Sequence, residues 1–391
     1  MKICNESNKC TGCGVCTNAC PKKAITLKKD KHGFLYPEID KKKCVECNIC
    51  NLTCPANKKQ EKKANTQYVY AAWNKNKKIR KKSSSGGIFS LIAEKIIKDN
   101  GVVVGVHWGE KNRPEHIMID DINKLWELNG SKYVQSFTGN IYSEIKKKLI
   151  ENKKVLFSGT PCQVHALKSF LKNKYSNIYY VDLICHGVPS QDVFDRYLNE
   201  RISENKSEID KIYLRYKNPY WDYSNVRIEF KNGNIYMKKT IDDSYFNLFN
   251  IGYSLRNSCH ECQYTNLHRY GDITLADFWG FQAKNFKMSD YLKGTSCIII
   301  NTENGKKLFE LIKNNITYEL EKIENVVKNQ VSLSKSFNPA NNDVESFWED
   351  YDKGMSIDEL NKKYIPNPFV EPNLMWLRRF KYKYWWVVKR K

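Results

Sequence analysis

Two cysteine motifs near the start of the chain constrain its fold more than any other feature. Residues 10–21 and 44–55 share the spacing C-x2-C-x2-C-x3-C-P, which binds 4Fe–4S clusters in two-cluster ferredoxins. In such a pair, the fourth cysteine of each motif binds the cluster of the other motif. The spacing therefore predicts two sets of four thiolates. They are Cys10, Cys13, Cys16 and Cys54 for the first cluster, and Cys44, Cys47, Cys50 and Cys20 for the second.

Zinc is the alternative metal for closely spaced cysteines. Zinc sites, however, use separated C-x2-C pairs without a third cysteine two residues further on, so the doubled run favours iron–sulfur clusters. The segment 24–43 between the motifs predicts a hairpin that turns at residues 31–33 and joins the two halves. We therefore expect residues 1–60 to form a ferredoxin-like α+β module. Cys4 lies outside the pattern, and we interpret it as a small buried residue rather than a ligand.

An α/β body is predicted after a polar linker at residues 57–66 and a strand at 68–73. Apolar strands and amphipathic helices then alternate, which argues for a mixed, partly parallel sheet. Further elements are expected as a basic loop at 75–87, strands at 101–108 and 295–300, strands followed by a turn at 154–161 and 178–190, a hairpin at 226–239, and helices at 88–100, 162–173, 191–204, 244–258 and 303–315. We divide the body into 66–150, 151–330 and a helical C-terminal extension at 331–391.

Residues 83–87 read SSSGG and directly precede the helix predicted at 88–100. Backbone N–H groups at a helix N-terminus bind anions. Together with the serine hydroxyls and the basic residues 80–82, they suit a group such as a flavin phosphate. From the residues alone, a flexible helix cap with solvated charges is an equally good interpretation.

Four cysteines in the body are enough for a third 4Fe–4S cluster. Cys162 and Cys185 each come just past the end of a predicted parallel strand, where open α/β sheets bind their ligands. Cys259 and Cys262 form a C-x2-C pair. The alternatives are ordinary buried cysteines and, for the pair, a redox-active motif or half a zinc site. Cys297 lies in an apolar strand and is expected in the core.

Several body motifs together resemble a known family. They are SSSGGIFS, SGTPCQVHALK, VDLICHGVPS, the Cys259–Cys262 pair followed by Gln-Tyr, and GDITLADFWG, in this order behind a ferredoxin module. The set resembles the family of coenzyme F420 hydrogenase/dehydrogenase β-subunits over about residues 1–330. The resemblance implies an iron–sulfur flavoprotein oxidoreductase that holds a flavin, usually FAD, beside a cluster. Its substrate would be a small-molecule hydride acceptor or donor of the coenzyme F420 type, or an unknown organic substrate linked to polysaccharide biosynthesis.

The resemblance also implies roles for single residues. It gives the inner cluster to Cys162, Cys185, Cys259 and Cys262, and it places the flavin against two turns with the cofactor-binding residues Ser84, Ser85, Gly86, Gly87, Gly159, Thr160 and Gln163. His186 follows a cluster ligand and is the catalytic candidate, as a proton donor at the flavin; a hydrogen-bonded structural histidine is the alternative. Asp277, Phe278 and Trp279 either line the same cleft or pack in the core.

Composition bears on location and on partners. No apolar stretch reaches the roughly 18 residues of a membrane span, and the start of the chain has no signal-like apolar region. We therefore expect a cytoplasmic protein whose 14 cysteines bind metal rather than form disulfides. The formal net charge of +22 reflects either a general lysine bias or attraction to an acidic ferredoxin or redox partner subunit. We expect no nucleic acid, because no binding motif accompanies the charge.

The tail at residues 373–391 combines aromatic and basic residues without an acidic one. It predicts peripheral docking on an anionic membrane surface, packing of a terminal helix on the body, or contact with a protein partner. For the whole chain, three functions remain open at this point. They are a flavin-dependent reductase, an electron-relay subunit of a larger redox complex without its own substrate, and a non-catalytic iron–sulfur protein of polysaccharide assembly.

Overall fold

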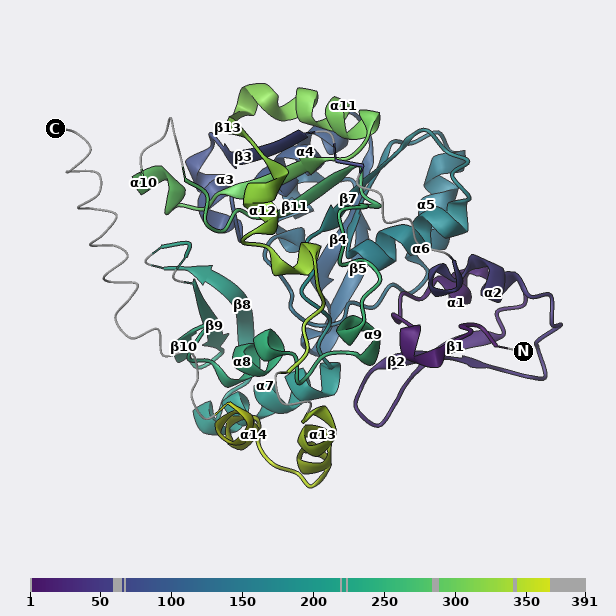
Figure 1. Cartoon of the computed structure of the whole chain (residues 1–391), viewed down its shortest axis with the longest axis vertical. Helices are drawn as coiled ribbons and strands as arrows, with labels where there is room; N and C mark the ends of the chain where they lie inside the picture. The colour runs from purple at the N-terminus through teal and green to yellow at the C-terminus, as the bar shows by residue number, and fades with distance from the viewer. Residues whose placement is uncertain are drawn as a thin grey trace.

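The computed structural model describes residues 2–58, 65–66, 68–218, 220–222, 224–282, 288–339 and 343–365. The predicted tail at 373–391 and much of the predicted linker at 57–66 lie outside the described residues. A ferredoxin-like module lies at one side of an α/β body (Figure 1), as the sequence predicts. Within the described ranges, no helix is both long and apolar enough to cross a membrane.

The module combines two short helices with one hairpin. Its elements are η1 (Ser7–Lys9), α1 (Val15–Ala19), β1 (Ile25–Lys29), β2 (Leu35–Ile39), α2 (Ile49–Thr53) and η2 (Pro55–Asn57). The two strands are antiparallel, and Gly33 in the turn has a left-handed backbone with φ of 82°. Each α-helix contains the third cysteine of its motif and ends at the fourth, whose backbone is extended. The C-x3-C spacing therefore spans one helical turn.

An eight-stranded mixed sheet forms the centre of the body. Its strands, in spatial order, are β13 (Ile316–Glu321), β3 (Tyr68–Asn74), β12 (Ser296–Ile300), β11 (Ile273–Asp277), β7 (Ile178–Leu183), β6 (Val155–Gly159), β4 (Val102–Trp108) and β5 (Pro114–Ile119). The central strands β11, β7, β6 and β4 are parallel to one another, whereas the outer pairs are antiparallel. This confirms the predicted mixed, partly parallel sheet.

Both faces of this sheet are buried. On β4, Val103 belongs to one hydrophobic core, and Val102 and Val104 belong to another, because successive side chains of a strand point to opposite faces. The Val103 face is covered by α4 (Ile88–Lys98) and α11 (Glu303–Ile312). The other face is covered by α5 (Ile141–Ile150) and α6 (Pro161–Leu171). The carboxyl ends of the parallel strands therefore meet at one edge between the two helical layers.

A second layer packs beside the sheet. It contains the antiparallel strands β8 (Ile209–Lys217), β9 (Ser224–Phe230) and β10 (Ile235–Lys239) with the helices α7 (Gln191–Asn205), α8 (Ser244–Ile251), α13 (Val344–Asp352) and α14 (Ile357–Tyr364). Phe34 of the module hairpin enters the same core. Shorter connecting elements are η3 (Glu110–Asn112), η4 (Ile122–Leu128), α9 (Asn257–His260), α10 (Met288–Tyr291), η5 (Lys313–Asn315), α12 (Ile323–Val327) and η6 (Val331–Leu333).

Most predicted elements are present, but two differ from the prediction. The segment 75–87, predicted as a basic loop, contains the helix α3 (Lys77–Lys82). It forms because the side chain of Asn76 accepts hydrogen bonds from two backbone N–H groups of the first turn, which caps the helix. The helix predicted over 244–258 stops after α8, because Gly252 takes a left-handed φ of 106°.

Two leucines on α11 give a matched test of the packing on the sheet. Leu308 is fully buried, whereas Leu311 is 50% exposed. We expect Leu308→Ala to lower the free energy of unfolding by about 2–5 kcal/mol, because it leaves a cavity in the core. Leu311→Ala should change it by less than about 0.5 kcal/mol. Anaerobic urea denaturation followed by circular dichroism measures both, and equal losses would contradict the assignment of the buried face.

Candidate iron–sulfur and flavin site

The structure groups the first predicted thiolate set on the side of the module that faces the body. Cys13, Cys16 and Cys54 are buried, and Cys10 is partly buried. Burial raises the pKa of the Cys16 thiol well above its usual value, and the charges of Cys13, Cys10 and Cys54 raise it further. The last cysteine of the second motif therefore lies with the first three of the first motif.

The second thiolate set lines one small cavity. Cys20, Cys44, Cys47 and Cys50 all contribute to its wall, together with apolar side chains such as Ile39. Cys47 is exposed to solvent. This set therefore lies at the outer end of the module. The role of each cysteine as a cluster ligand stays a prediction.

Cys4 is only partly buried, rather than enclosed in the core as expected. Its Sγ lies 3.0 Å from the carbonyl oxygen of Glu6. A hydrogen bond to Cys54 raises the pKa of Cys4 and lowers that of Cys54 to about 7. Cys4 thus lies beside the first set and contacts one of its members.

Separate loops bring the four body cysteines together at the carboxyl edge of the sheet. Cys162 lies in the first turn of α6, after β6; Cys185 follows β7; and Cys259 lies in α9, just before Cys262. Burial raises the pKa of all four thiols, to about 12 for Cys259 and about 11 for Cys262. The charges of neighbouring body thiolates raise the pKa values of Cys185, Cys259 and Cys262 further.

The four body cysteines adjoin the first module set. Burial raises the pKa of Cys13 to about 12, with further contributions from the charges of Cys10, Cys162 and Cys54. Thr11, within the first motif, hydrogen-bonds the thiol of Cys162. Among the described residues, no three His, Cys, Asp or Glu side chains are grouped as ligands of one metal ion. A four-iron cube places its thiolates farther apart than a single ion does.

Buried hydrogen bonds hold the module against the body near these cysteines. The carbonyl oxygen of Cys13 accepts from Thr138 Oγ1 at 3.1 Å and from the Tyr142 hydroxyl at 2.9 Å. In α1, Asn18 Nδ2 donates to the carbonyl of Gly139 at 2.7 Å. The helices α1 and α6 also pack together. The first motif is therefore fixed to the sheet edge by its own backbone.

Arg256 forms a second link between the module and the body. The residue is fully buried, and it donates to the carbonyls of Cys10 and Leu35, both at 2.7 Å. Its guanidinium also lies over the ring of Tyr36, 4.2 Å from the ring centre. The positive charge opposes the rise in the pKa of Cys259. Arg256 thus lies between the first module set and the body set.

Arg269 occupies a similar position on the other side of the body set. It is buried, donates to the carbonyl of Leu183 at 2.8 Å and lies 3.4 Å from Asp182. Its charge opposes the rise in the pKa of Cys262. The sequence prediction missed both Arg256 and Arg269. A usable signal was present, because arginine is rare in this lysine-rich chain.

The SSSGG segment forms a well-bonded loop at the N-terminus of α4. Ser84 Oγ accepts from the backbone N–H of Ser131 at 2.9 Å, and Ser85 Oγ donates to the carbonyl of Thr295 at 3.0 Å. The N–H of Gly86 donates to Ser296 Oγ at 2.9 Å. A Cβ at Gly86 would lie 2.5 Å from the carbonyl oxygen of Ala72. Packing against the sheet therefore requires glycine at Gly86, and Gly87 caps the helix with φ of 81°.

Strand β8 carries Lys217, which contacts this loop, and Arg215 two residues earlier. Lys217 donates to the carbonyls of Arg80 at 2.6 Å and Ser85 at 2.8 Å, and burial lowers its pKa to about 7. Arg215 pairs with Asp277 at 2.9 Å. Among the described residues, no hydrogen-bond partner is present for its buried Nε and Nη2 atoms. A buried donor without an acceptor is costly, so these two donors have unused capacity for hydrogen bonding.

A chain of contacting rings connects Arg215 with the body cysteines. Arg215 donates to the hydroxyl of Tyr133 at 3.3 Å, and the ring of Tyr133 lies 5.3 Å from that of Phe249. Phe249 in turn lies 4.8 Å from the ring of His186, between ring centres. His186 directly follows Cys185 in the chain. The loop with its basic side chains and the body thiolates therefore belong to one continuous region.

The predicted catalytic residue His186 is largely buried in this region. Its Nε2 lies 3.2 Å from the carbonyl oxygen of Phe249, and its ring packs on Phe337 at 3.8 Å. Burial lowers its pKa to about 4, so the ring is neutral at pH 7. The proposed role as a proton donor stays a prediction.

The second predicted flavin turn begins α6. Gly159 ends β6, and Thr160 and Gln163 form a capping box. Gln163 Nε2 also donates to Ser136 Oγ at 3.0 Å. Thr160 Oγ1 lies 3.0 Å from the Sγ of Cys162. This turn therefore positions Cys162. Of the other predicted cleft residues, Asp277 pairs with Arg215, while Phe278 and Trp279 pack in the core beside it.

Three family profiles match the chain. The profile for the N-terminal part of the beta subunit of coenzyme F420 hydrogenase/dehydrogenase matches residues 69–141, and the profile for the C terminus of the same protein matches residues 152–326. A "4Fe-4S dicluster domain" matches residues 9–58. The two β-subunit profiles together span more than half of the chain.

Two individual proteins are also similar to the chain. A subunit of the F(420)H(2) dehydrogenase of Methanosarcina mazei is 23% identical over 319 residues, which cover 79% of this chain and 83% of the relative. A chain from the F420-reducing NiFe hydrogenase complex of Methanosarcina barkeri matches 76% of this chain and 97% of its own length, at 14% identity and a TM-score of 0.48. With a dicluster domain followed by both β-subunit profiles, the chain belongs to the family of coenzyme F420 hydrogenase/dehydrogenase β-subunits and is an iron–sulfur electron-transfer protein.

Proposed function

We propose that this protein is an iron–sulfur flavoprotein oxidoreductase with three 4Fe–4S clusters and one FAD. The observation that carries the proposal is the grouping of Cys162, Cys185, Cys259 and Cys262 directly beside the first module set. Bound clusters supply one-electron steps, and a bound flavin supplies two-electron hydride chemistry. The chain's own residues would hold the clusters and the flavin in succession from the module to the sheet edge.

The body cysteines fit a cluster for a physical reason. Burial raises the pKa of all four thiols, so four isolated thiolates would be unstable there. Iron stabilises thiolates, because metal binding deprotonates a coordinating thiol. Arg256 and Arg269 add positive charge close to this set. The residues therefore suit a deprotonated, metal-bound state better than four free thiols.

The region around Arg215 fits a flavin. The unpaired Nε and Nη2 atoms of Arg215 present two donors that match a carbonyl or phosphate oxygen of the cofactor. The SSSGG loop borders this region, because Lys217 on the same strand bonds to Ser85. Arg215, rather than Gly86, is therefore the residue we expect to contact FAD. Asp277 would hold the guanidinium in place through its ion pair.

The substrate we propose is a hydride acceptor or donor of the coenzyme F420 type, with an organic substrate of polysaccharide biosynthesis as the other class. The Methanosarcina mazei relative is named as one subunit of a dehydrogenase. That name favours a second candidate function, an electron-relay subunit that serves a larger redox complex and has no substrate of its own. Turnover of coenzyme F420 by the isolated holoprotein would distinguish the first function from the second.

The first test counts iron. Anaerobically purified protein should contain about twelve iron atoms per chain, because three four-iron clusters are expected. Cys162→Ala should lower the count to about eight, since one thiolate of the inner cluster is lost. Iron and acid-labile sulfide assays measure this.

Cys297→Ala is the matched control for this test. Cys297 is also buried, but it lies in the core of β12, so the variant should keep about twelve iron atoms. A wild-type count near eight, or an unchanged count in Cys162→Ala, would remove the inner cluster from the proposal.

The second test measures flavin affinity. Arg215→Lys keeps a positive charge near Asp277 but loses the guanidinium donors, so we expect FAD to bind about 10- to 100-fold more weakly. This corresponds to about 1.5–3 kcal/mol for a charged hydrogen bond. Titration of deflavinated protein with FAD, followed by flavin fluorescence, gives the dissociation constant.

Arg227→Lys serves as the control on the neighbouring strand β9. Arg227 pairs with Glu229 at 2.8 Å and has no contact with the SSSGG loop among the described residues. Its FAD affinity should stay within about twofold of wild type. Equal affinities for the two variants would exclude Arg215 as a flavin contact, and folded protein that takes up no FAD at all would refute the flavoprotein assignment.

A further inference from the structure

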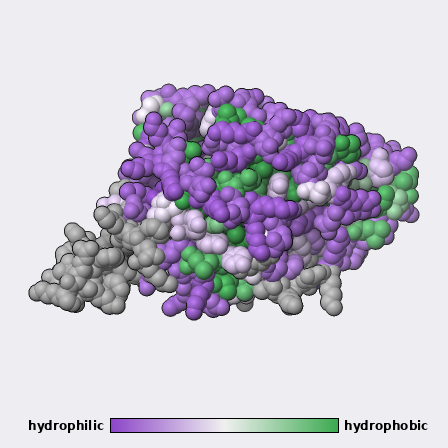
Figure 2. Space-filling model, turned by 90° about the horizontal axis from the view of Figure 1, so that it is seen from above, coloured by the Kyte–Doolittle hydropathy of each residue, from purple (hydrophilic) through white to green (hydrophobic). Residues whose placement is uncertain are grey.

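The outer end of the module exposes apolar side chains next to a cluster cysteine. Val45 is 58% exposed, Ile49 is 41% exposed and Leu52 is 68% exposed. Cys47, between Val45 and Ile49 in the chain, is exposed as well. Figure 2 shows apolar surface at the end of the molecule that the module occupies. We call this surface, defined by Val45, Cys47, Ile49 and Leu52, the module tip.

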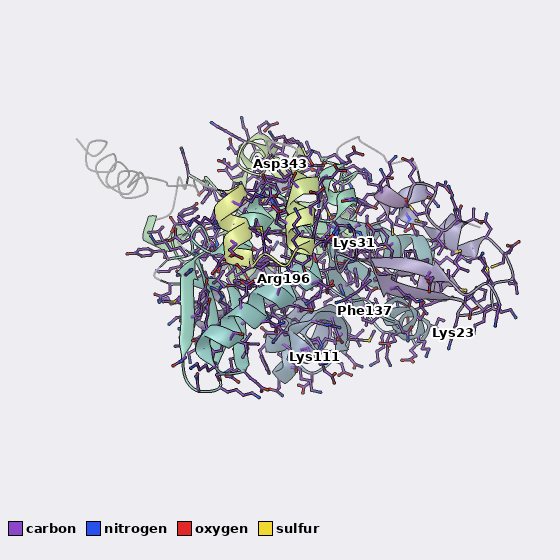
Figure 3. The ribbon with its side chains drawn as sticks, turned by 90° about the horizontal axis from the view of Figure 1, so that it is seen from below. Lys23, Lys31, Lys111, Phe137, Arg196 and Asp343 are labelled. Atoms are coloured by element: carbon purple, nitrogen blue, oxygen red, sulfur yellow. The ribbon has the colours of Figure 1, made fainter. Side chains whose placement is uncertain are left out.

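Lysines outnumber acidic residues next to the module tip in the sequence, although the exposed Glu46 lies between Val45 and Cys47. Lys22 lines the cavity of the second cysteine set, and Lys23, Lys41 and Lys42 are exposed nearby in the chain. Figure 3 shows Lys23 at the outer end of the module. Within the part of the chain that the structure describes, these four lysines form no ion pair, whereas Lys43 pairs with Asp40 at 3.4 Å. Their charges are therefore available to an approaching partner.

We propose that the module tip is the docking surface for a small acidic electron-transfer protein, which exchanges electrons with the second cluster. A compact apolar centre with a charged rim is the usual composition of a protein–protein interface. The positive charge of the lysines favours an acidic partner and increases its rate of association. The proposal rests on the proposed function, and it adds the partner class and the place of contact.

The position of the second cysteine set supports this assignment. The first set adjoins Cys162 of the body, and three of its four cysteines are buried, so the body covers more of the first set than of the second. The second set has Cys47 at the surface. A partner at the module tip would therefore meet the second cluster first, and electrons would pass inward through the first cluster. One electron leaves the partner and reduces one cluster in each encounter, and no proton or other reactant is required.

The experiment mixes the anaerobic holoprotein with a reduced, acidic two-cluster ferredoxin in a stopped-flow instrument. For wild type, we expect the bimolecular rate constant to fall about tenfold or more between low and high NaCl concentration, because salt screens the attraction. The double variant Lys41→Glu, Lys42→Glu should lower the rate at low salt about tenfold and remove most of the salt dependence. Leu52→Gln should lower the rate while leaving the salt dependence unchanged.

The matched control is Lys306→Glu, Lys307→Glu on α11, which makes the same change in net charge. Figure 1 places α11 over the body, apart from the module. The rate constant of this control variant should stay within about twofold of wild type at each salt concentration. Equal rates for the two double variants, or a wild-type rate that does not depend on salt, would overturn the docking surface.

Two further measurements separate the alternatives. Reduced methyl viologen needs no docking surface, so it should reduce all variants equally; a holoprotein that viologen cannot reduce would refute the proposed function instead. Flotation with anionic phospholipid vesicles tests whether the module tip binds an anionic membrane instead of an acidic protein. If the Lys41→Glu, Lys42→Glu variant loses vesicle binding but keeps its rate with the ferredoxin, the tip is a membrane contact and the protein partner is wrong.

Discussion

A buried guanidinium connects the two parts of this protein. Arg256 donates to the carbonyls of Cys10 and Leu35 in the module from a position in the body that is fully shielded from water. A buried charge is stable only while its hydrogen bonds are made. Separation of the module would remove both carbonyl acceptors and leave, among the described contacts, the body's Gln135 Oε1 at 3.2 Å. The module and the body are therefore expected to behave as one rigid unit, and the spacing between the first and the inner thiolate sets is fixed.

The arginines of the site serve two different purposes. Arg256 and Arg269 have acceptors in the protein, and their charges offset the thiolates that burial would otherwise neutralise. Arg215 pairs with Asp277, but two of its buried donors have no acceptor among the residues that the structure describes. Arg256 and Arg269 thus stabilise negative charge on the chain's own thiolates. The two donors of Arg215 are the basis of our proposal that this residue contacts a bound flavin.

The sequence predicted the module and the alternating strands and helices of the body well, because both depend on local signals. The C-x3-C spacing equals one helical turn, and the strands around Val103 are apolar on both faces. The sequence prediction was wrong where one side chain determines the local structure, as at the Asn76 cap of α3. The scarcity of arginine singles out Arg215 and Arg256 in the sequence, but it does not identify their partners, which lie at sequence separations of 62 and 246 residues. The sequence also could not foresee that the N–H of Gly86 is used within the protein.

The wide sequence separation of the body cysteines has a consequence for biosynthesis. Both module sets are complete once the first 54 residues have been made, whereas the body set also requires Cys259 and Cys262. Both cysteines come after β7 and α6 in the chain, so the four body cysteines are all present only once residue 262 has been made. With the proposed third cluster bound by the body set, iron delivery to a growing chain would occur in two stages. The module can be loaded while translation continues, and the inner position can be filled only after most of the chain has left the ribosome.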